Sequence, residues 1–569
     1  MRRRLSWAAI ASLALGLLPA GAYADAAPPA RSPAPSNPPG ATAAGTASGA
    51  VPGAAPEDDD RPLDLRTYAQ GIEALRAGRR DEAARLLRHV FNDFPDSPQA
   101  PAALLKVAEM GYPVSSWAQV GSATPAAVQQ ATELLGRLAQ KYRASREASR
   151  ALVLLGYLGL EPANPKADLD EACSRFATAA QIYPDSESAD DAYFGSGVCD
   201  LLRDRPARAA DVLGRLIEEH PDSPLAPEAL YRQGVALSLL ADPAEAMLAL
   251  QRLRNRYPDS PLAQSALARI TLLHRMRFGP VQGAAGAASP PTKGGAAAPP
   301  RDPSAAVVYR LDPDYGATLD AATPPIRGVS DISIDAQGLA VIASPRTPGV
   351  FRLDARGRIQ ERITHPGPDH IAAAEGLAVY ISGKQQIAVN ARNWSGTDFK
   401  GADGRAPIDY GPIAVDALGR VYLLDRHENA VLIYDRTRRL AGAVRPPAGK
   451  EGRFVDVAAG DENGIFVLDG RSRTVLELHQ GKETHRTDLG ATGVTDPIAL
   501  AVDGLGDLYV LDGGSGAVLV VDPAGHRLAT VRLPKEAQAR LGEATAVAVD
   551  PMGRLYLAGR KSGVVVRLQ

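Results

Sequence analysis

The stretch IAVDALGRVYLLD, residues 413–425, consists of an apolar segment, a short polar turn and a second apolar segment that ends on an aspartate. Asp416 and Gly419 suit the turn, because an Asp side chain bonds its own backbone two residues on and Gly accepts a positive φ. The stretch therefore predicts two strands joined by a tight turn. Copies of it recur along the C-terminal half of the chain, and their turn glycines are Gly338, Gly376, Gly419, Gly464, Gly506 and Gly553.

The six turn glycines are separated by 38, 43, 45, 42 and 47 residues. A period near forty residues that is built of short strands is typical of propeller blades. In the best copies two further apolar segments follow the first pair, as at 430–435 and 440–444. We therefore predict that residues 306–569 form an all-β, six-bladed propeller.

These copies resemble NHL repeats, a family of propellers in which Asp-x-x-Gly, a second strand similar to Tyr-Val-x-Asp and an Asn-containing loop recur. In the third copy these features are Asp416 with Gly419, residues 422–425 and Asn429. The resemblance covers roughly Val307 to the C-terminus, and the second copy, residues 371–389, departs from it most.

Closure of the ring can also be predicted. A propeller normally joins its two ends within one blade, because this removes an exposed sheet edge. The sixth copy stops one strand short, and an additional apolar segment precedes the first copy. We therefore expect this segment, residues 307–312 and 317–320, to pair with residues 564–568.

The first 24 residues have the features of a secretory signal peptide: three arginines, an apolar run at 5–18 and the small-x-small cleavage site Ala22-Tyr23-Ala24. No cysteine lies near this site, which argues against a lipid anchor, and no stretch of the chain is a candidate transmembrane segment. Residues 25–60, rich in Ala and Pro, are predicted to be a disordered linker. The mature protein is expected to be periplasmic or secreted.

Residues 61–278 have a helical pattern. An aromatic residue or His followed by Pro-Asp-Ser occurs at 94–97, 183–186, 220–223 and 257–260. Small residues at fixed distances before these prolines, such as Gly197 and Gly234, let two antiparallel helices approach closely. The pattern resembles tetratricopeptide repeats, in particular those of envelope proteins such as the Tol–Pal coordinating and outer-membrane assembly proteins. It implies an α-solenoid of five helix pairs and a capping helix at 261–277, whose concave face holds an extended peptide or a partner helix.

The two cysteines, Cys173 and Cys199, fall on neighbouring antiparallel helices of this region. Counted from the turn near Asp185 they lie 12 and 14 residues away, and hence at nearly the same height. An exported protein can keep a disulfide. We therefore favour a disulfide between them over the alternative of two buried free thiols.

Residues 279–305, rich in Gly, Ala and Pro, are predicted to be a second flexible linker. Such a segment does not fix the relative position of the domains that it joins. We therefore expect the solenoid and the propeller to be free to reorient.

No phosphate-binding loop, nucleophile elbow or His-Glu-x-x-His motif occurs in the chain. The Asp-x-x-Gly turns lack the companion carboxylates of a calcium loop, so we assign their aspartates to local backbone bonding. Some NHL-like propellers are lyases with a histidine-bound metal in the central channel. The candidates here are His365, His370 and His427, but they lack a fixed ligand spacing and are more simply surface residues. We predict neither a metal nor a cofactor.

Cations recur in the loops between the second and third strands of the blades, which all point to one face. They are Arg346, Lys384, Arg426, Arg471, Arg473, Arg560 and Lys561. They are either ordinary solvated loop charges or a platform for an acidic partner, since like charges on one rim focus the electric field. The net charge of the whole chain is −2, which points to neither nucleic acid nor a membrane surface. Some intracellular NHL propellers bind RNA on this face, but anionic glycan, peptidoglycan or an acidic protein suits an exported protein better.

These features together indicate an exported, non-enzymatic scaffold or adaptor that binds other macromolecules through the solenoid and the basic loops. One alternative is a propeller enzyme, a metal-dependent lyase or a hydrolase-like protein with its site in the central channel. Another alternative is a sensor whose channel binds a small envelope ligand. The three hypotheses differ in what the channel holds.

Overall fold

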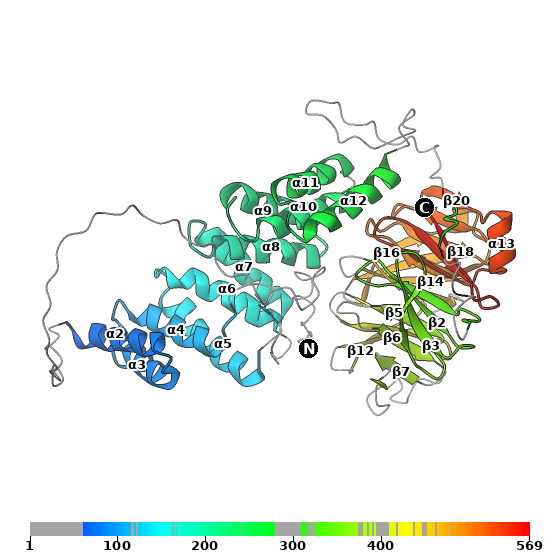
Figure 1. Ribbon diagram of the computed structural model, residues 1–569. Helices are drawn as coiled ribbons and strands as arrows, with labels where there is room; N and C mark the ends of the chain where they lie inside the picture. Colours follow the sequence, from blue (N-terminus) through cyan, green and yellow to red (C-terminus); the bar gives the residue numbers. More distant parts are fainter. Residues whose placement is uncertain are drawn as a thin grey trace, which may run out of the picture.

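The chain forms an α-helical solenoid followed by a β-propeller (Figure 1). The computed structural model describes residues 61–114, 119–120, 123–161, 164, 166, 168–240, 242–278, 309–315, 319, 325–373, 379–383, 386–389, 392–393, 409–416, 419–435, 439–446, 452–460, 464–479 and 481–569. The predicted signal peptide and both predicted linkers lie outside these residues. None of the helices in the described ranges is both long and apolar enough to cross a membrane.

Five antiparallel helix pairs and one further helix make up the described part of the solenoid. They are α2 (Leu63–Arg76) with α3 (Arg80–Asp93), α4 (Ala100–Gly111) with α5 (Pro125–Lys141), α6 (Glu147–Leu160) with α7 (Leu169–Ile182), α8 (Ala189–Leu202) with α9 (Pro206–Glu219), α10 (Ala226–Leu239) with α11 (Pro243–Arg256), and finally α12 (Leu262–Arg277). Consecutive helices contact one another along the stack. The expected helix pairs and capping helix are therefore present.

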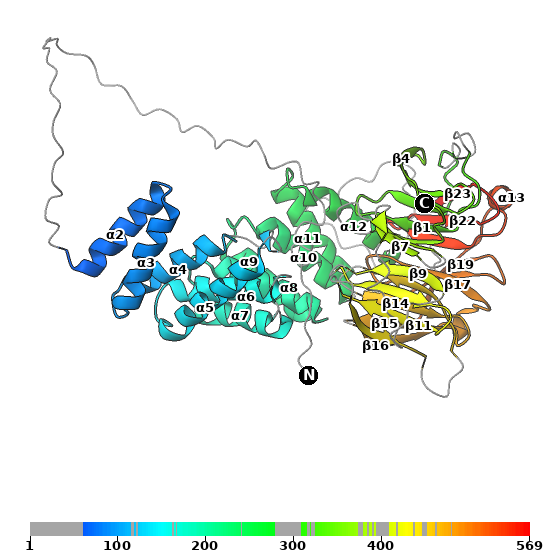
Figure 2. The ribbon, with the colours of Figure 1, turned by 90° about the horizontal axis from the view of Figure 1, so that it is seen from below.

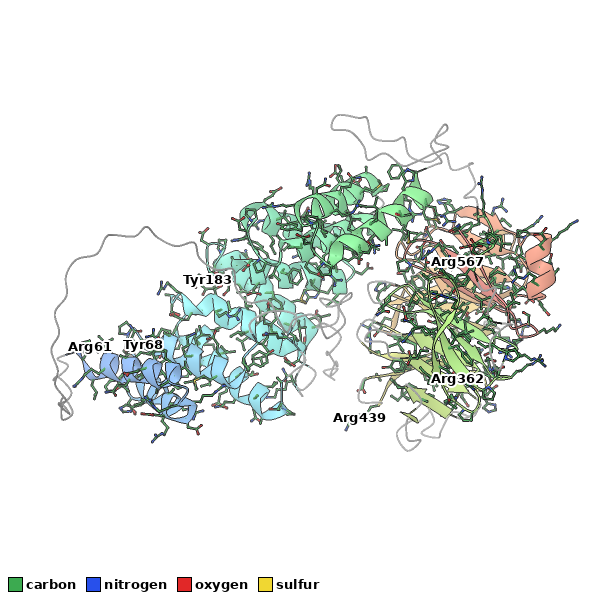
Figure 3. All side chains as sticks on the ribbon, viewed as in Figure 1. Arg61, Tyr68, Tyr183, Arg362, Arg439 and Arg567 are labelled. Carbon is green, nitrogen blue, oxygen red and sulfur yellow. A yellow bond between two sulfur atoms is a disulfide. The ribbon has the colours of Figure 1, made fainter. Side chains whose placement is uncertain are left out.

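Two features of the repeat motif explain this stacking. A Cβ atom on Gly197 would lie 2.6 Å from Cγ of Leu213, so α8 and α9 could not pack as closely with a larger residue there. The aromatic residue at the end of one pair also reaches the turn of the pair before it. The Tyr183 hydroxyl, at the end of α7 (Figure 3), donates a hydrogen bond of 2.6 Å to the carbonyl of Arg143. The repeat pattern thus supplies both the glycine that lets the two helices of a pair pack closely and the aromatic residue that bonds to the preceding pair.

A disulfide joins Cys173 of α7 to Cys199 of α8, and their Cα atoms lie 5.5 Å apart. Both residues are buried in the core of the solenoid. The bond cross-links the third helix pair to the fourth.

The propeller consists of six antiparallel sheets within the described residues. Their strands are β1 (Asp331–Ile334), β2 (Ala340–Ser344), β3 (Gly349–Leu353) and β4 (Ile359–Ile363) in blade one; β5 (His370–Ala373), β6 (Val379–Gly383), β7 (Gln386–Val389) and β8 (Arg392–Asn393) in blade two; β9 (Tyr410–Val415), β10 (Val421–Asp425), β11 (Ala430–Tyr434) and β12 (Leu440–Val444) in blade three; β13 (Phe454–Ala459), β14 (Gly464–Asp469), β15 (Thr474–His479) and β16 (Lys482–Asp488) in blade four; β17 (Pro497–Val502), β18 (Leu508–Asp512), β19 (Val518–Val521) and β20 (Arg527–Val531) in blade five; and β21 (Ala546–Val549), β22 (Leu555–Ala558) and β23 (Val565–Leu568) in blade six.

The sheets form a closed ring, which confirms the predicted fold class. The first strands contact one another in the cyclic order β1, β5, β9, β13, β17, β21 and back to β1. Leu311 bridges Leu568 in antiparallel fashion, and Arg310 exchanges two backbone hydrogen bonds of 2.8 Å with Gln569. The segment before blade one therefore completes blade six, as its sequence predicted. A short helix, α13 (Lys535–Leu541), and the 3-10 turn Gly490–Thr492 lie in connections between blades.

The Asp-x-x-Gly turns join the first two strands of a blade. In blade three Oδ1 of Asp416 accepts the backbone N–H of Arg420 at 2.9 Å, and Gly419 has a φ of 69°. In blade six Oδ1 of Asp550 accepts the N–H groups of Met552 and Arg554 in the same way. These carboxylates thus bond local amides, the structural role that the sequence suggested.

The two faces of the propeller carry different connections. We call the face with the turns between first and second strands the turn face. The opposite face has the loops between second and third strands and the connections between blades, and we call it the loop face. Antiparallel pairing fixes this arrangement, since each second strand ends where its first strand begins.

Helix α12 packs against the turn face (Figures 1 and 2). Leu272 and Met276 share a core cluster with Leu505 and Tyr509 of blade five. Arg277 forms an ion pair with Asp507, whose side chain is fully buried. The expectation that the solenoid and the propeller reorient freely is therefore wrong for this structure, because a buried apolar contact and a buried ion pair hold them together.

Candidate functional site

A cavity of about 400 Å³ runs through the propeller between the first strands. Its two ends differ. The strands end on the turn face with apolar residues, among them Ile334, Val415 and Val549, whereas the charged and titratable residues of the lining lie toward the loop face. We call this polar end the channel mouth; its charged or titratable residues are Asp331, His370, Arg426, Asp456 and Arg560. The channel mouth is the candidate functional site, because propeller chemistry needs polar groups that converge on a cavity.

Three of these residues form a chain across blades one to three. Nη2 of Arg426 lies 2.6 Å from Nε2 of His370, and Nδ1 of His370 lies 3.5 Å from Oδ2 of Asp331. A guanidinium can only donate, so Nε2 must accept, and the ring proton must be on Nδ1, toward Asp331. Asp331 is held in turn by the backbone N–H of Ile371, 3.0 Å from Oδ2. The chain therefore fixes the orientation of His370 and uses its accepting nitrogen.

Asp456 of β13 is the second acid of the channel mouth. Its oxygens accept the N–H groups of Val457 at 2.8 Å and of Leu500, in the next blade, at 2.7 Å. Burial, and after it the negative charge of Asp331, raise the pKa of Asp456 to about 8. Asp456 therefore keeps its proton up to near-neutral pH and becomes charged as the pH rises through about 8.

The predicted basic residues lie in loop-face loops, but their environments differ. Arg346, Arg471, Arg473 and Arg560 are exposed. A Cβ atom on Gly328 would touch both Cδ of Arg346 and the carbonyl of Arg560, which places these two arginines side by side.

Other predicted cations have acidic or inward contacts. Nζ of Lys561 lies 3.3 Å from Glu543, so part of its charge is compensated. Arg426 contacts His370 in the channel and lies 3.8 Å from Asp409, so it is not the simple rim cation that was predicted. Lys384 lies outside the described residues. The described cations of this set are all exposed in loop-face loops, and Arg426 and Lys561 also lie near acidic side chains.

The three histidine candidates do not converge. His365 lies in the connection from β4 to β5, is 2% exposed and accepts the N–H of Gly367 through Nδ1. Burial lowers its pKa. His427 is exposed in the β10–β11 loop, away from His370 in the channel mouth. Across the described ranges no three His, Cys, Asp or Glu side chains are grouped so that they could hold a metal ion.

The sequence interpretation missed Asp331 and Asp456. Both lie in first strands and differ from the apolar residues at most channel positions, which was the available signal. Their convergence depends on ring closure, since they are contributed by blades one and four. A pattern search along the chain does not bring such residues together.

The comparisons with known proteins bear on the solenoid. A model of the tetratricopeptide repeat family matches residues 191–223 and 228–260, which confirms repeats of this type in the solenoid. The search of curated proteins found no match.

Several solved structures resemble the chain over less than half of its length. They include a streptogramin B lyase (12% identity, 46% of this chain and 97% of that one, TM-score 0.35), virginiamycin B lyase from Staphylococcus aureus (11%, 46% and 86%, TM-score 0.33) and a gluconolactonase from Xanthomonas campestris (16%, 46% and 94%, TM-score 0.33). At these identities and TM-scores the similarity assigns no activity to this chain.

Proposed function

We propose that the protein is an exported, non-enzymatic adaptor. The loop face of the propeller would bind an acidic partner, and the concave face of the solenoid would hold a segment of a second protein. The observation that carries this proposal is the position of α12, which covers the turn face and leaves the exposed arginines of the loop face open. Exposed cations gathered on one face attract acidic surfaces.

The geometry of His370 supports binding rather than catalysis. A general base needs a free nitrogen within hydrogen-bonding distance of a substrate proton. Nε2 of His370 instead accepts from Arg426, and Nδ1 faces Asp331. The channel mouth is therefore better suited to hold a charged group than to abstract a proton.

We infer a periplasmic or secreted location and a partner of matching chemistry: an acidic protein, an anionic glycan or peptidoglycan. Two features support the location, namely the signal-like residues 1–24 and the disulfide between Cys173 and Cys199, a bond that persists in oxidising compartments. Both an acidic protein and an anionic polymer present carboxylates, the group that arginine binds best.

The double substitution Arg346→Glu/Arg471→Glu tests the loop face. Both side chains are exposed, so the variant should fold normally but recover much less acidic partner from a cross-linked envelope extract. The matched control is Arg356→Glu/Arg439→Glu, which makes the same change of charge in two exposed turns on the opposite face; Arg439 projects from the edge of the propeller (Figure 3). Equal recovery by both variants would contradict the proposal. Cross-links to α4, α6 or α8 from a second protein would support use of the solenoid.

The polar channel mouth also favours a second function, the sensing of a small ligand. Sugars or muropeptides that bind there should raise the melting temperature of the wild type, and the substitution His370→Ala should abolish the shift. Metal analysis of the same samples separates this function from a metal-dependent enzyme. Stoichiometric zinc or calcium, lost on substitution of His365, His370 or His427, would favour the enzyme.

A further inference from the structure

Blade five departs at one position of the Asp-x-x-Gly turn from blades three and six, which we call its sister blades. Blades three and six carry an arginine directly after the turn glycine, and its Nε donates to the turn aspartate. The distances are 2.6 Å from Arg420 to Asp416 and 2.5 Å from Arg554 to Asp550. Blade five has Asp507 at this position. It therefore has a second carboxylate where the sister blades have a guanidinium.

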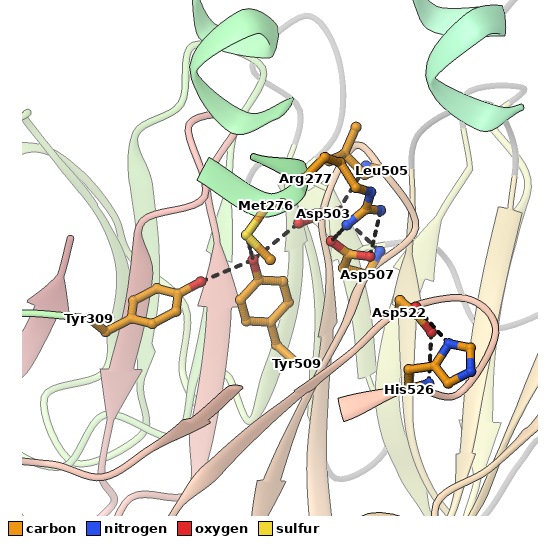
Figure 4. Close-up of polar contacts among 9 residues, drawn as sticks. All are labelled: Met276, Arg277, Tyr309, Asp503, Leu505, Asp507, Tyr509, Asp522 and His526. Atoms are coloured by element: carbon orange, nitrogen blue, oxygen red, sulfur yellow. Dashed lines mark hydrogen bonds and ion pairs between the residues drawn. The ribbon is translucent and has the colours of Figure 1, made fainter. Parts of the chain in front are cut away.

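The missing guanidinium comes from the solenoid (Figure 4). Nη1 and Nη2 of Arg277 each donate a 2.8 Å hydrogen bond to one oxygen of Asp507. The side chain of Asp507 is 0% exposed, and among the described residues Arg277 is the donor recorded for its carboxylate. Without Arg277 this buried charge would lose its partner, a change that is strongly unfavourable.

The second acid of blade five is held within the blade. Oδ1 of Asp503 accepts the N–H groups of Leu505 and Asp507, and Oδ2 accepts the hydroxyl of Tyr509 at 3.1 Å. Burial, and after it the nearby Asp507, raise the pKa of Asp503. Blade five thus contributes two neighbouring buried acids, and no cation among its own described residues is recorded as paired with either of them.

We propose that blade five carries a guanidinium-binding site, formed by Asp507 with the charge of Asp503 nearby, whose ligand is an arginine at the end of a helix. Arg277 of α12 is that ligand in this chain. The parallel pair of hydrogen bonds fits a planar guanidinium and not the point charge of a lysine.

Leu272 also lies against Gly553 of blade six, so α12 contacts two blades, and the site determines which of them receives Arg277. The corresponding positions of blades three and six already hold Arg420 and Arg554, which would repel a second guanidinium. The apolar contacts of Leu272 and Met276 add buried area but do not select among blades with similar turns. Blades three and six thus repel Arg277, whereas blade five pairs with it. An interface becomes specific through such a combination of repulsion and attraction.

The test uses the full mature chain with a protease site placed between residues 279 and 305. After cleavage the two halves of the wild type should elute together in gel filtration. The substitution Asp507→Arg gives blade five the residue of its sister blades and places it against Arg277. The propeller should still melt cooperatively, while the affinity between the halves should fall at least about 30-fold, as for the loss of a buried charge partner.

Two matched variants complete this experiment. Glu536→Arg makes the same change of charge at an exposed residue of α13, and its halves should stay together. The double substitution Arg277→Glu/Asp507→Arg exchanges the charges and should recover much of the affinity. Halves that remain together with Asp507→Arg alone would overturn the proposal, since apolar contact would then be sufficient.

Substitutions in α12 keep the test decisive if Asp507→Arg prevents folding of the propeller. Arg277→Met removes the charge from a helix end and leaves the propeller sequence intact. Arg277→Lys keeps the charge but not the paired hydrogen bonds. The affinity should decrease from wild type to Arg277→Lys and further to Arg277→Met. Equal affinity for all three proteins would show that blade five does not recognise a guanidinium.

Discussion

On the turn face of the propeller the arginines of blades three and six pair with the buried aspartates of their own turns, whereas on the loop face Arg346 and Arg471 are exposed. The difference follows from the connections. The turn between the first and second strands folds back on its own sheet, so the aspartates in it are buried and paired. The loops between the second and third strands instead reach solvent, where water screens the charge of an arginine. Arginine thus stabilises the turn face by pairing with buried aspartates, whereas the exposed arginines of the loop face can bind a partner.

Blade five shows that the rule of the turn face holds even where the blade lacks its arginine. Its buried Asp507 is paired as well, but by Arg277 from a helix 230 residues away along the chain. The need to pair a buried carboxylate therefore connects the two domains. We expect the following substitutions to separate the structural arginines from the solvated ones.

The largest effect is expected for Arg420→Ala in blade three. The Arg420 side chain is 6% exposed and that of Asp416 0%, so the substitution leaves a buried carboxylate without its cation. The free energy of unfolding should fall by about 3–5 kcal/mol. The matched loop-face substitution Arg471→Ala should change it by about 0.5 kcal/mol or less. Chemical denaturation of both variants measures the difference, and similar values would remove the distinction between the faces.

An intermediate effect is expected from Asp456, a buried acid near the loop face that bonds two backbone N–H groups instead of an arginine. Its pKa is about 8 in the folded protein, against about 4 in an unfolded chain. Between these values the folded state binds more protons, so the free energy of unfolding should decrease as the pH rises from 4 to 8. Below pH 4 both states are protonated and this contribution is constant.

The substitution Asp456→Asn isolates this contribution, because an amide does not titrate. Its loss of a hydrogen-bond acceptor lowers stability equally at all pH values. The wild type should lose stability between pH 5 and pH 8.5 through this group, whereas the variant should not. The stability of the variant relative to the wild type should therefore be higher at pH 8.5 than at pH 5. Denaturation curves at both pH values measure this, and a difference that is independent of pH would exclude a raised pKa.

Much of this fold could be predicted from sequence because both domains are repetitive. The Asp-x-x-Gly period gave six blades, and the segment before blade one was correctly matched to the last strand through Leu311 and Leu568. The docking of α12 was not predicted, since a flexible linker says nothing about what its ends contact. Yet a signal existed: Asp507 stands where Arg420 and Arg554 stand in the sister blades.

The candidate site was less predictable than the fold. The position of Arg426 in a loop-face loop followed from the blade pattern, but its contact with His370 did not. That contact joins blades two and three, and its two residues are 56 positions apart in the chain. It depends on the side-chain rotamer of Arg426 as well as on the closure of the ring. Asp331 and Asp456 were missed for a related reason, because only the closed ring brings their two blades to one channel.

The smallest effect on stability is expected on the loop face, where it is most informative. Arg346→Glu/Arg471→Glu should change the free energy of unfolding by about 0.5 kcal/mol or less, because both side chains are solvated. Binding to an acidic polymer should nevertheless weaken, and the binding of the wild type should depend more steeply on salt than that of the variant. Titrations at about 50 and 300 mM salt, with Arg356→Glu/Arg439→Glu as the control, measure both effects. If the double variant is as stable as the wild type and binds with the same salt dependence, the loop-face arginines are merely solvated charges; if it unfolds, they belong with the buried arginines of the turn face.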